Sequence, residues 1–178
     1  MGMNEEKISA LSDSQLCDFF VDQVNEIFHA EKRIFIAWPR FENEAQVPSL
    51  KESFEEYYQQ LQKQIIRLEG IFTILDIKPD ERNPEAIEGL LRETDAIIDK
   101  TTEGSHTRDA AIVVAVQKIG HYKIATYGSL QQLASTLGME DISNLLGQSL
   151  QEEKNSDLLL SGIADKKINW LAEIETKE

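Results

Sequence analysis

The stretch AAIVVAVQKIGHYKIATYGSL, from Ala110 to Leu130, decides which fold the sequence predicts. It reads as one long helix with a narrow inward stripe at three- and four-residue steps. That stripe runs through Val113, Val116, Gly120, Ile124 and Tyr127. Gly120 is unexpected in mid-helix, where it costs about 1 kcal/mol relative to Ala. Lys123, at the edge of the stripe, needs an anionic partner if it is buried. If three other helices surround this one, both positions face the middle of a bundle.

Two long helical patterns precede this stretch. The first opens at Ser12 or Asp13, either of which is a suitable N-cap, and Pro39 is expected to kink or end it. The segment from there to Val47 is then an irregular link. The second pattern starts at Pro48, and its inward stripe is read as Leu50, Phe54, Tyr57, Leu61, Ile65, Leu68, Phe72 and Leu75.

The remaining patterns fix the connections. A shorter helix is expected from Pro84 to about Lys100, the central helix ends near Gly138, and a last helix runs from about Glu140 to Trp170. The long connection between the second and third long helices lets them run parallel, as in a ferritin-like bundle with one crossover. We therefore predict an all-α, ferritin-like four-helix bundle whose crossover contains a short extra helix. The bundle spans residues 11–170, between a flexible N-terminus (1–10) and a frayed tail (171–178).

Composition excludes several classes of function. The 32 acidic residues outnumber the 18 basic ones, giving a net charge of −14 that disfavours direct binding to nucleic acid. No stretch is apolar for long enough to span a membrane. Residues 1–10 lack the apolar core of a signal peptide, and a single cysteine, Cys17, fits a reducing compartment, so we expect a cytoplasmic protein. No phosphate-binding glycine loop, nucleophile elbow, HExxH or paired-cysteine motif is present, so no catalytic residue is predicted and an enzyme is not favoured.

Polar residues that interrupt the inward stripes mark the centre of the predicted bundle. They are Glu31 on the first helix, Tyr57 and Gln60 on the second, Gly120 and Lys123 on the third, and Glu153 on the fourth. Carboxylates and imidazoles at such positions are the ligands of two-metal ferritin-like centres. Only two of these residues are carboxylates. His121 lies about 100° around the helix from Gly120, so its orientation stays open.

These residues stand in segments that resemble the YciE/YciF family of ferritin-like proteins. The segments are HAEKRI (29–34), FEEYYQQLQKQIIRLEGIF (54–72), RDAAIVVAVQKIGHYKIATYGSL (108–130) and QEEKNSD (151–157), in the family's order. The resemblance covers roughly residues 11–165. It implies a four-helix ferritin-like domain, linked with bacterial stress responses, whose family carries a di-metal centre.

Position by position, the resemblance preserves only part of that centre. The acid of the family's AEK motif is kept as Glu31, and the acidic pair of its EEK motif as Glu152 and Glu153. Where the family shows a His followed three positions later by a Glu, this chain has Tyr57 and Gln60. The family's Glu-His-Tyr-Glu becomes Gly120-His121-Tyr122-Lys123 here.

The residues themselves suggest what replaces the metal. An isolated buried carboxylate is very costly, so inward Glu31 and Glu153 require a cation. We expect the Lys123 ammonium to bridge them, with hydrogen bonds from Tyr57 and Gln60, while Gly120 leaves room for the lysine stem or a water. Glu31 could instead pair on the surface with Lys32 or Arg33, and either Glu152 or Glu153 could be the inward acid.

Two hypotheses for function follow. The first, which we favour, is a non-enzymatic, metal-free protein with a degenerate centre, acting in stress adaptation as a homodimer or by binding another protein. The second is a di-iron or di-manganese carboxylate protein, an oxidase or metal store, with ligands drawn from Glu31, His121, Glu152 and Glu153. No cofactor is expected in the first case, and iron or manganese in the second.

Overall fold

A computed structural model describes residues 14–176. The helices are α2 (Gln15–Glu44), α3 (Pro48–Leu75), α4 (Glu85–Lys100), α5 (His106–Thr136) and α6 (Glu140–Ile163), followed by a π-helical turn η1 (Ala164–Ile168) and α7 (Asn169–Glu173). The Ser14 side chain caps α2 by accepting a hydrogen bond from the Cys17 N–H. Ser12, Asp13 and the N-terminus predicted to be flexible lie outside the described residues.

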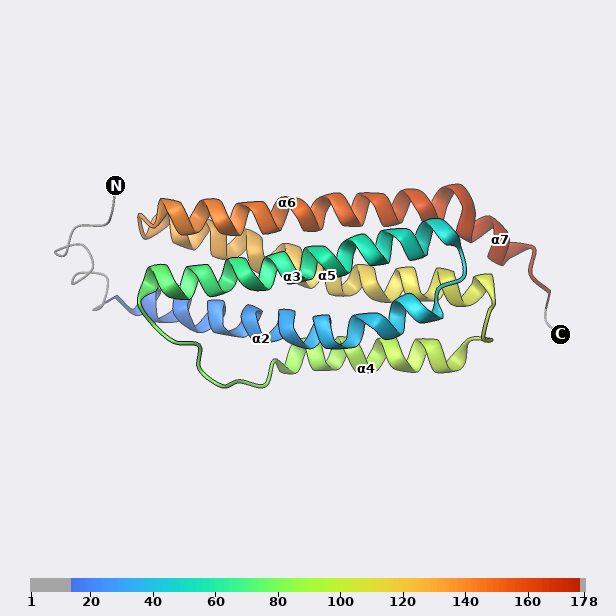
Figure 1. Cartoon of the computed structure of the whole chain (residues 1–178), viewed down its shortest axis with the longest axis horizontal. Helices are drawn as coiled ribbons and strands as arrows, with labels where there is room; N and C mark the ends of the chain where they lie inside the picture. The colour runs from blue at the N-terminus through green and yellow to red at the C-terminus, as the bar shows by residue number, and fades with distance from the viewer. Residues whose placement is uncertain (1–13, 177–178) are drawn as a thin grey trace.

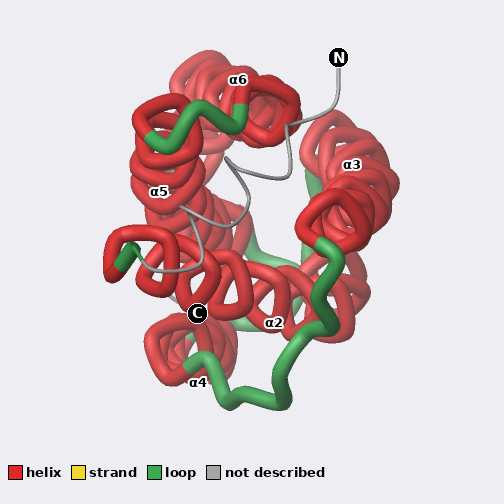
Figure 2. The backbone as a smooth tube through the Cα atoms, turned by 90° about the vertical axis from the view of Figure 1, so that its left-hand side faces the viewer, coloured by secondary structure: helices red, strands yellow, loops and turns green. Residues whose placement is uncertain are grey.

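The predicted bundle and its crossover are confirmed. Figure 1 shows α3 and α5 running in the same direction, antiparallel to α2 and α6. Viewed along the bundle, α2, α3, α6 and α5 surround one core, and α4 lies outside them against α5 and α2 (Figure 2). The crossover from α3 begins at Asp76, which adopts the left-handed conformation and closes the last turn of α3. Helix α5 ends where Gly138, at a φ of 72°, turns the chain into α6.

Pro39 does not end the first helix, so the predicted irregular link is wrong. Helix α2 continues through the proline to Glu44, although Pro39 has no N–H to donate within the helix. Its neighbours Trp38 and Phe41 are buried, and the Trp38 indole N–H donates to the Phe54 carbonyl at 2.9 Å. Burying a large apolar side chain stabilises a fold by about 1.5–3 kcal/mol, enough for two of them to outweigh the loss of one helical hydrogen bond.

The end of the chain is more ordered than predicted. Helix α7 continues to Glu173, and Leu171 packs against the core. The Glu175 carboxylate accepts hydrogen bonds from the backbone N–H groups of His106 and Thr107, both at 2.9 Å. Residues 171–175 therefore do not form a frayed tail, because they supply a partner for donors that the start of α5 leaves free.

Two adjacent residues at the start of α5 join the ends of three helices. The buried Arg108 guanidinium pairs with Glu44 and donates to the carbonyls of Ile98 and Thr101 at the end of α4. The fully buried Asp109 carboxylate accepts from the N–H groups that link α2 to α3. Within residues 14–176, no helix has the length and apolar character needed to cross a bilayer.

We predict that Asp109→Asn destabilises the fold by about 1–3 kcal/mol, since one buried backbone N–H loses its acceptor. The Asp109 oxygens lie 2.7 Å from the Gln46 nitrogen and 3.1 Å from the Val47 nitrogen. Urea unfolding measures the change. The matched control Asp165→Asn alters an exposed residue. Equal unfolding free energies of Asp109→Asn and Asp165→Asn would contradict this role of Asp109.

Candidate functional site

The centre of the bundle is organised around the ammonium of Lys123 on α5. Its side chain is 0% exposed, and its Nζ lies 2.8 Å from Glu153 Oε1 and 3.1 Å from Glu31 Oε1. Nζ also donates to Gln64 Oε1 at 2.8 Å and to the Tyr57 hydroxyl oxygen at 2.9 Å. An ammonium has three hydrogens, and these serve Tyr57, Gln64 and Glu153. Glu31 then interacts with it as a neighbouring charge.

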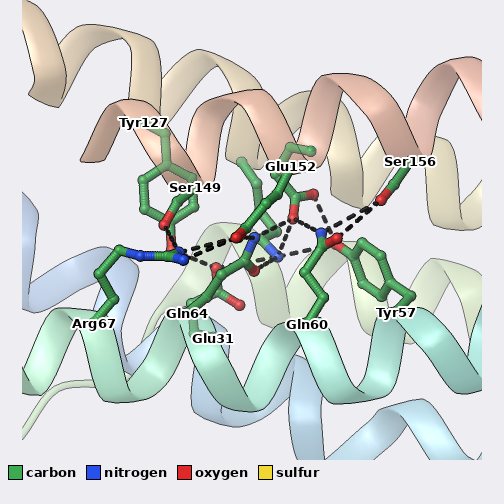
Figure 3. Close-up of polar contacts among 11 residues, drawn as sticks. Glu31, Tyr57, Gln60, Gln64, Arg67, Tyr127, Ser149, Glu152 and Ser156 are labelled. Atoms are coloured by element: carbon green, nitrogen blue, oxygen red, sulfur yellow. Dashed lines mark hydrogen bonds and ion pairs between the residues drawn. The ribbon is translucent and has the colours of Figure 1, made fainter. Parts of the chain in front are cut away.

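Glu153 is the more fully satisfied of the two central carboxylates. Its Oε1 accepts from Lys123 and from the amides of Gln60 at 3.2 Å and Gln64 at 2.9 Å, and its Oε2 accepts from the Tyr57 hydroxyl at 2.7 Å. Figure 3 labels three of these donors, Tyr57, Gln60 and Gln64, on α3. Every donor in this set is a side chain from α3 or α5. Charge-assisted hydrogen bonds of this kind compensate for the loss of water around a buried carboxylate.

Glu31 is less well satisfied. The Tyr127 hydroxyl donates to its Oε1 at 2.6 Å, while Oε2 is buried without a partner. Burial, opposed by Lys123 and reinforced by the charge of Glu153, raises the pKa of Glu31 to about 7. Two ionised carboxylates and one ammonium would leave one uncompensated negative charge in the core. A proton on Glu31 removes that charge.

The two tyrosines at the centre act as neutral donors. Burial first, and then the nearby carboxylates, raise the pKa of Tyr57 and of Tyr127 well above the usual value of 10. Each hydroxyl therefore keeps its proton at neutral pH and donates it to a glutamate. Tyr57 in addition accepts from Lys123, which gives its hydroxyl two partners.

A second ion pair closes the centre toward the surface. Arg67 on α3 binds the Glu152 carboxylate through two nitrogens, at 2.8 and 3.0 Å, and donates to the Ser149 hydroxyl at 2.7 Å. Gln64 connects this pair with the core, because its amide donates to Glu152 at 3.1 Å as well as to Glu153. Glu153 is thus the inward acid and Glu152 the outer one, a choice that the sequence left open.

Four of the residues expected at the centre meet there directly, namely Glu31, Tyr57, Lys123 and Glu153. Gln60 lies at the rim, where its amide contacts Glu153 and the Ser156 hydroxyl at 3.3 Å. A Cβ on Gly120 would lie 4.0 Å from Glu153 Oε2. The free space at the glycine therefore faces the carboxylate, in a cavity of about 10 Å³ that is close to the space one water needs.

At two places in the predicted stripes, the fully buried residue is the polar neighbour of the apolar residue. Ile65, which packs against the core, and Ile124 are only partly buried, whereas their neighbours Gln64 and Lys123 are fully buried. Lys123 was expected at the centre beside Ile124, but at the other place only Ile65 was predicted to face inward, although Gln64 follows Tyr57 by seven residues and so shares its face. Tyr127 was expected as a core aromatic, and only the position of Glu31 reveals its hydrogen-bonding partner.

The four residues of the alternative ligand set do not converge. The His121 side chain is 64% exposed and its Nε2 lies 3.3 Å from Asp157 Oδ1, on the outside of the bundle. Glu152 is held by Arg67. In the part of the chain from residue 14 to 176, no three His, Cys, Asp or Glu side chains gather as a metal site would require.

The donors at the centre do not fit a di-metal group. Two carboxylates without an imidazole cannot neutralise two divalent ions, and Glu153 already accepts hydrogen bonds from the Lys123 ammonium and the Gln64 amide. A divalent ion placed between Glu31 and Glu153 would also be repelled by the Lys123 charge. What the arrangement supplies chemically is a neutralised, internally hydrogen-bonded core.

Replacing Lys123 by methionine should destabilise the protein by about 3–5 kcal/mol at pH 7, because it leaves two buried carboxylates without a cation. Part of this loss should be recovered at pH 5, where a carboxylate in such a site takes up a proton. Chemical denaturation at both pH values measures the unfolding free energy that the variant loses and recovers. Lys118→Met is the control, since Lys118 forms a surface pair with Glu93 that is worth at most about 1 kcal/mol. Equal effects of the two variants would contradict the assignment.

The raised pKa of Glu31 predicts a definite dependence of stability on pH. Since an unfolded glutamate titrates near 4.5, the folded state binds more protons than the unfolded state between about pH 4.5 and 7. The stabilisation that a protonated Glu31 provides is therefore present below pH 4.5 and lost as the pH rises through 7. Relative to the wild type, Glu31→Gln should gain up to about 3 kcal/mol in unfolding free energy across this window.

Urea titrations of both proteins from pH 4.5 to 8 test this, with the exposed Glu69→Gln as control. Unfolding free energies of wild type and Glu31→Gln that keep a constant difference over the whole range would show that Glu31 titrates normally.

Comparisons with known proteins agree with this fold. Protein YciF of Escherichia coli strain K12 is 32% identical over 157 residues, covering 88% of this chain and 94% of YciF. The crystal structure of YciF, described as a stress protein, superposes with a TM-score of 0.82 at 30% identity and covers 88% of this chain and 98% of the other. The structure of YcfI from Rhodopseudomonas palustris, which is described as a proposed structural protein, superposes with a TM-score of 0.80 at 34% identity. It covers 83% of this chain and 94% of YcfI.

A protein from Xanthomonas campestris, XCC3681, shares the fold with a TM-score of 0.70 at 16% identity, over 89% of this chain and 97% of the other. A family model described as a domain of unknown function, DUF892, matches residues 15–173. That match spans every helix described above. The chain belongs to the DUF892 family, together with the YciF protein that it resembles in sequence and structure.

Proposed function

We propose that this protein is a metal-free member of its family that acts through its surface, as a structural or partner-binding protein in bacterial stress adaptation. The observation that carries the proposal is the position of Lys123 Nζ, within 3.1 Å of both central carboxylates. Between Glu31 and Glu153, the Lys123 ammonium supplies the positive charge that metal ions supply in a di-metal centre. The description of YciF as a stress protein supports the physiological context.

The cluster of Lys123, Glu31, Glu153 and Tyr57, called the lysine centre below, has no place for a reacting group. Glu153 accepts hydrogen bonds on both oxygens, and its tyrosine partner holds its proton at neutral pH. Two small cavities, of about 50 and 10 Å³, lie beside Tyr57. The larger could hold one or two waters by volume, which is far below the 300 Å³ or more of a typical ligand pocket. Function is therefore expected on the outer faces of the helices.

Metal analysis of the purified protein tests the proposal against the di-iron or di-manganese alternative. Cells are supplied with iron or manganese, and the protein is purified without a chelator. We expect far less than one metal ion per chain by elemental analysis. Added Mn²⁺ or Fe²⁺ should also leave the melting temperature unchanged, because only a ligand that binds the folded state stabilises it.

Near-stoichiometric metal that disappears in Glu31→Ala, but stays in the exposed control Glu69→Ala, would overturn the proposal in favour of a carboxylate metal protein. A rise of the melting temperature with metal concentration in the wild type, absent from the Glu31→Ala variant, would do the same independently of any purification loss.

A further inference from the structure

A groove at one end of the bundle is large enough to hold a small molecule. It has a volume of about 490 Å³, within the roughly 300–1,000 Å³ of typical ligand sites. It is lined by Ser49 at the start of α3 and by residues of the last turns of α6 and of η1. Figure 1 shows the start of α3 and the end of α6 at the same end of the molecule. The lining residues of α6 and η1 are Leu158, Leu159, Gly162, Ile163, Lys166 and Lys167.

The part of the groove that α6 supplies is apolar. Leu158 and Leu159 are 71% and 47% exposed, and Ile163 is partly buried. At Gly162 an added Cβ would meet no other atom within 4 Å, so this part of the groove is open. An apolar group lying here would remove the leucines from water, which favours binding in proportion to the apolar area that is covered.

The part that η1 supplies is basic. The Asn169 N–H bonds to the Ala164 carbonyl five residues earlier, so this turn contains one residue more than an α-helical turn. Ile168 is buried, whereas Lys166 and Lys167 are exposed and both line the groove. Two consecutive lysines therefore border the same cavity.

These two lysines lack a counter-charge in the protein. None of the lining residues is acidic, although 32 of the 178 residues of the chain are Asp or Glu. Among residues 14–176, neither Lys166 nor Lys167 has an ion-pair partner. The start of α3 at Ser49 has no side-chain cap, and free N–H groups at a helix start add to the attraction for an anion.

Charge and apolar surface together define the class of ligand that fits the groove. A compact inorganic anion would pair with the lysines and leave the leucines in water, whereas a neutral hydrocarbon would leave the lysines without a partner. An anion that carries an apolar chain satisfies both parts. Because ion pairs at a protein surface contribute little, the chain supplies most of the affinity and the anionic group fixes the orientation.

We propose that this groove binds a free single-chain fatty acid. Its carboxylate lies beside Lys166 and Lys167, and its acyl chain covers Leu158, Leu159 and Ile163. The helical segment from Leu158 to Lys167 is about 14 Å long, which suits a chain of medium length. Because the groove is open to solvent, binding is weak and rapidly reversible. No residue of the lysine centre takes part, so this inference does not depend on the metal content of the core.

Titration of the ¹⁵N-labelled protein with decanoate, followed by NMR, tests the proposal. Backbone amide signals of Ser49 and of residues 158–167 should shift and saturate. In the series hexanoate, octanoate and decanoate, each kept below its micelle-forming concentration, every added methylene that reaches the groove should tighten binding by up to about fourfold. The cationic decyltrimethylammonium has a chain of the same length and should bind more weakly than decanoate.

Two matched pairs of variants assign the two parts of the groove. Lys166→Gln/Lys167→Gln should weaken decanoate binding by at least about threefold, and Lys78→Gln/Lys100→Gln, which removes two exposed lysines elsewhere, should not. Gly162→Leu should fill the groove and block binding. Its control is Gly70→Leu on α3, where an added Cβ also meets nothing within 4 Å. Circular dichroism verifies that every variant is folded.

Decanoate that causes no saturable shift of the groove signals overturns the proposal, as does equal binding by the wild type and a folded Gly162→Leu variant. Two other occupants would also overturn it. Groove signals that move with protein concentration in the absence of decanoate indicate a second copy of the chain. Groove signals that respond to phosphatidylglycerol vesicles but not to decanoate indicate a membrane surface.

Discussion

One buried ammonium determines the rest of the centre. With Lys123 enclosed by four helices, each of its three hydrogens needs an acceptor and its charge needs a counter-charge, and α3, α2 and α6 supply them through Tyr57, Gln64, Glu31 and Glu153. Breaking such a pair on one side costs far more than the pair contributes over an apolar core. The lysine therefore makes the surrounding polar residues necessary to one another, which holds the four helices in a single register.

The same interaction bears on whether a metal could bind at the centre of the bundle. A metal centre needs carboxylates and imidazoles with free lone pairs, whereas the lone pairs of Glu153 are occupied by a lysine, two amides and a phenol. Glu31 keeps one unpaired oxygen and a pKa near neutrality, so it carries the remaining imbalance of charge. The centre is therefore a hydrogen-bonded network whose charge balance depends on the proton of Glu31.

The helical patterns, the long connection and the resemblance of residues 108–130 to a known family were sufficient to predict the bundle and its crossover helix. Interruptions of the apolar stripes then predicted that Lys123 meets Glu31 and Glu153. They were not sufficient where a polar and an apolar residue compete for one place, as at Gln64 and Ile65, because periodicity favours the apolar residue and the polar partner lies on another helix. The prediction of an irregular link after Pro39 failed for a similar reason. Its local effect on the backbone is visible in the sequence, while the burial of Trp38 and Phe41 that outweighs it depends on α3. The π turn at Ala164–Ile168, which buries Ile168 and leaves Lys167 exposed, is not marked by any sequence pattern.

The central claim is that an ammonium, and not a metal, lies between Glu31 and Glu153. Anomalous diffraction from crystals soaked in Fe²⁺ and in Mn²⁺, recorded at the absorption edge of each metal, tests it most directly. We expect no anomalous peak between the two carboxylates, and Lys123 Nζ in electron density within hydrogen-bonding distance of Glu153. A peak at that place, with the lysine side chain displaced from both glutamates, would contradict it.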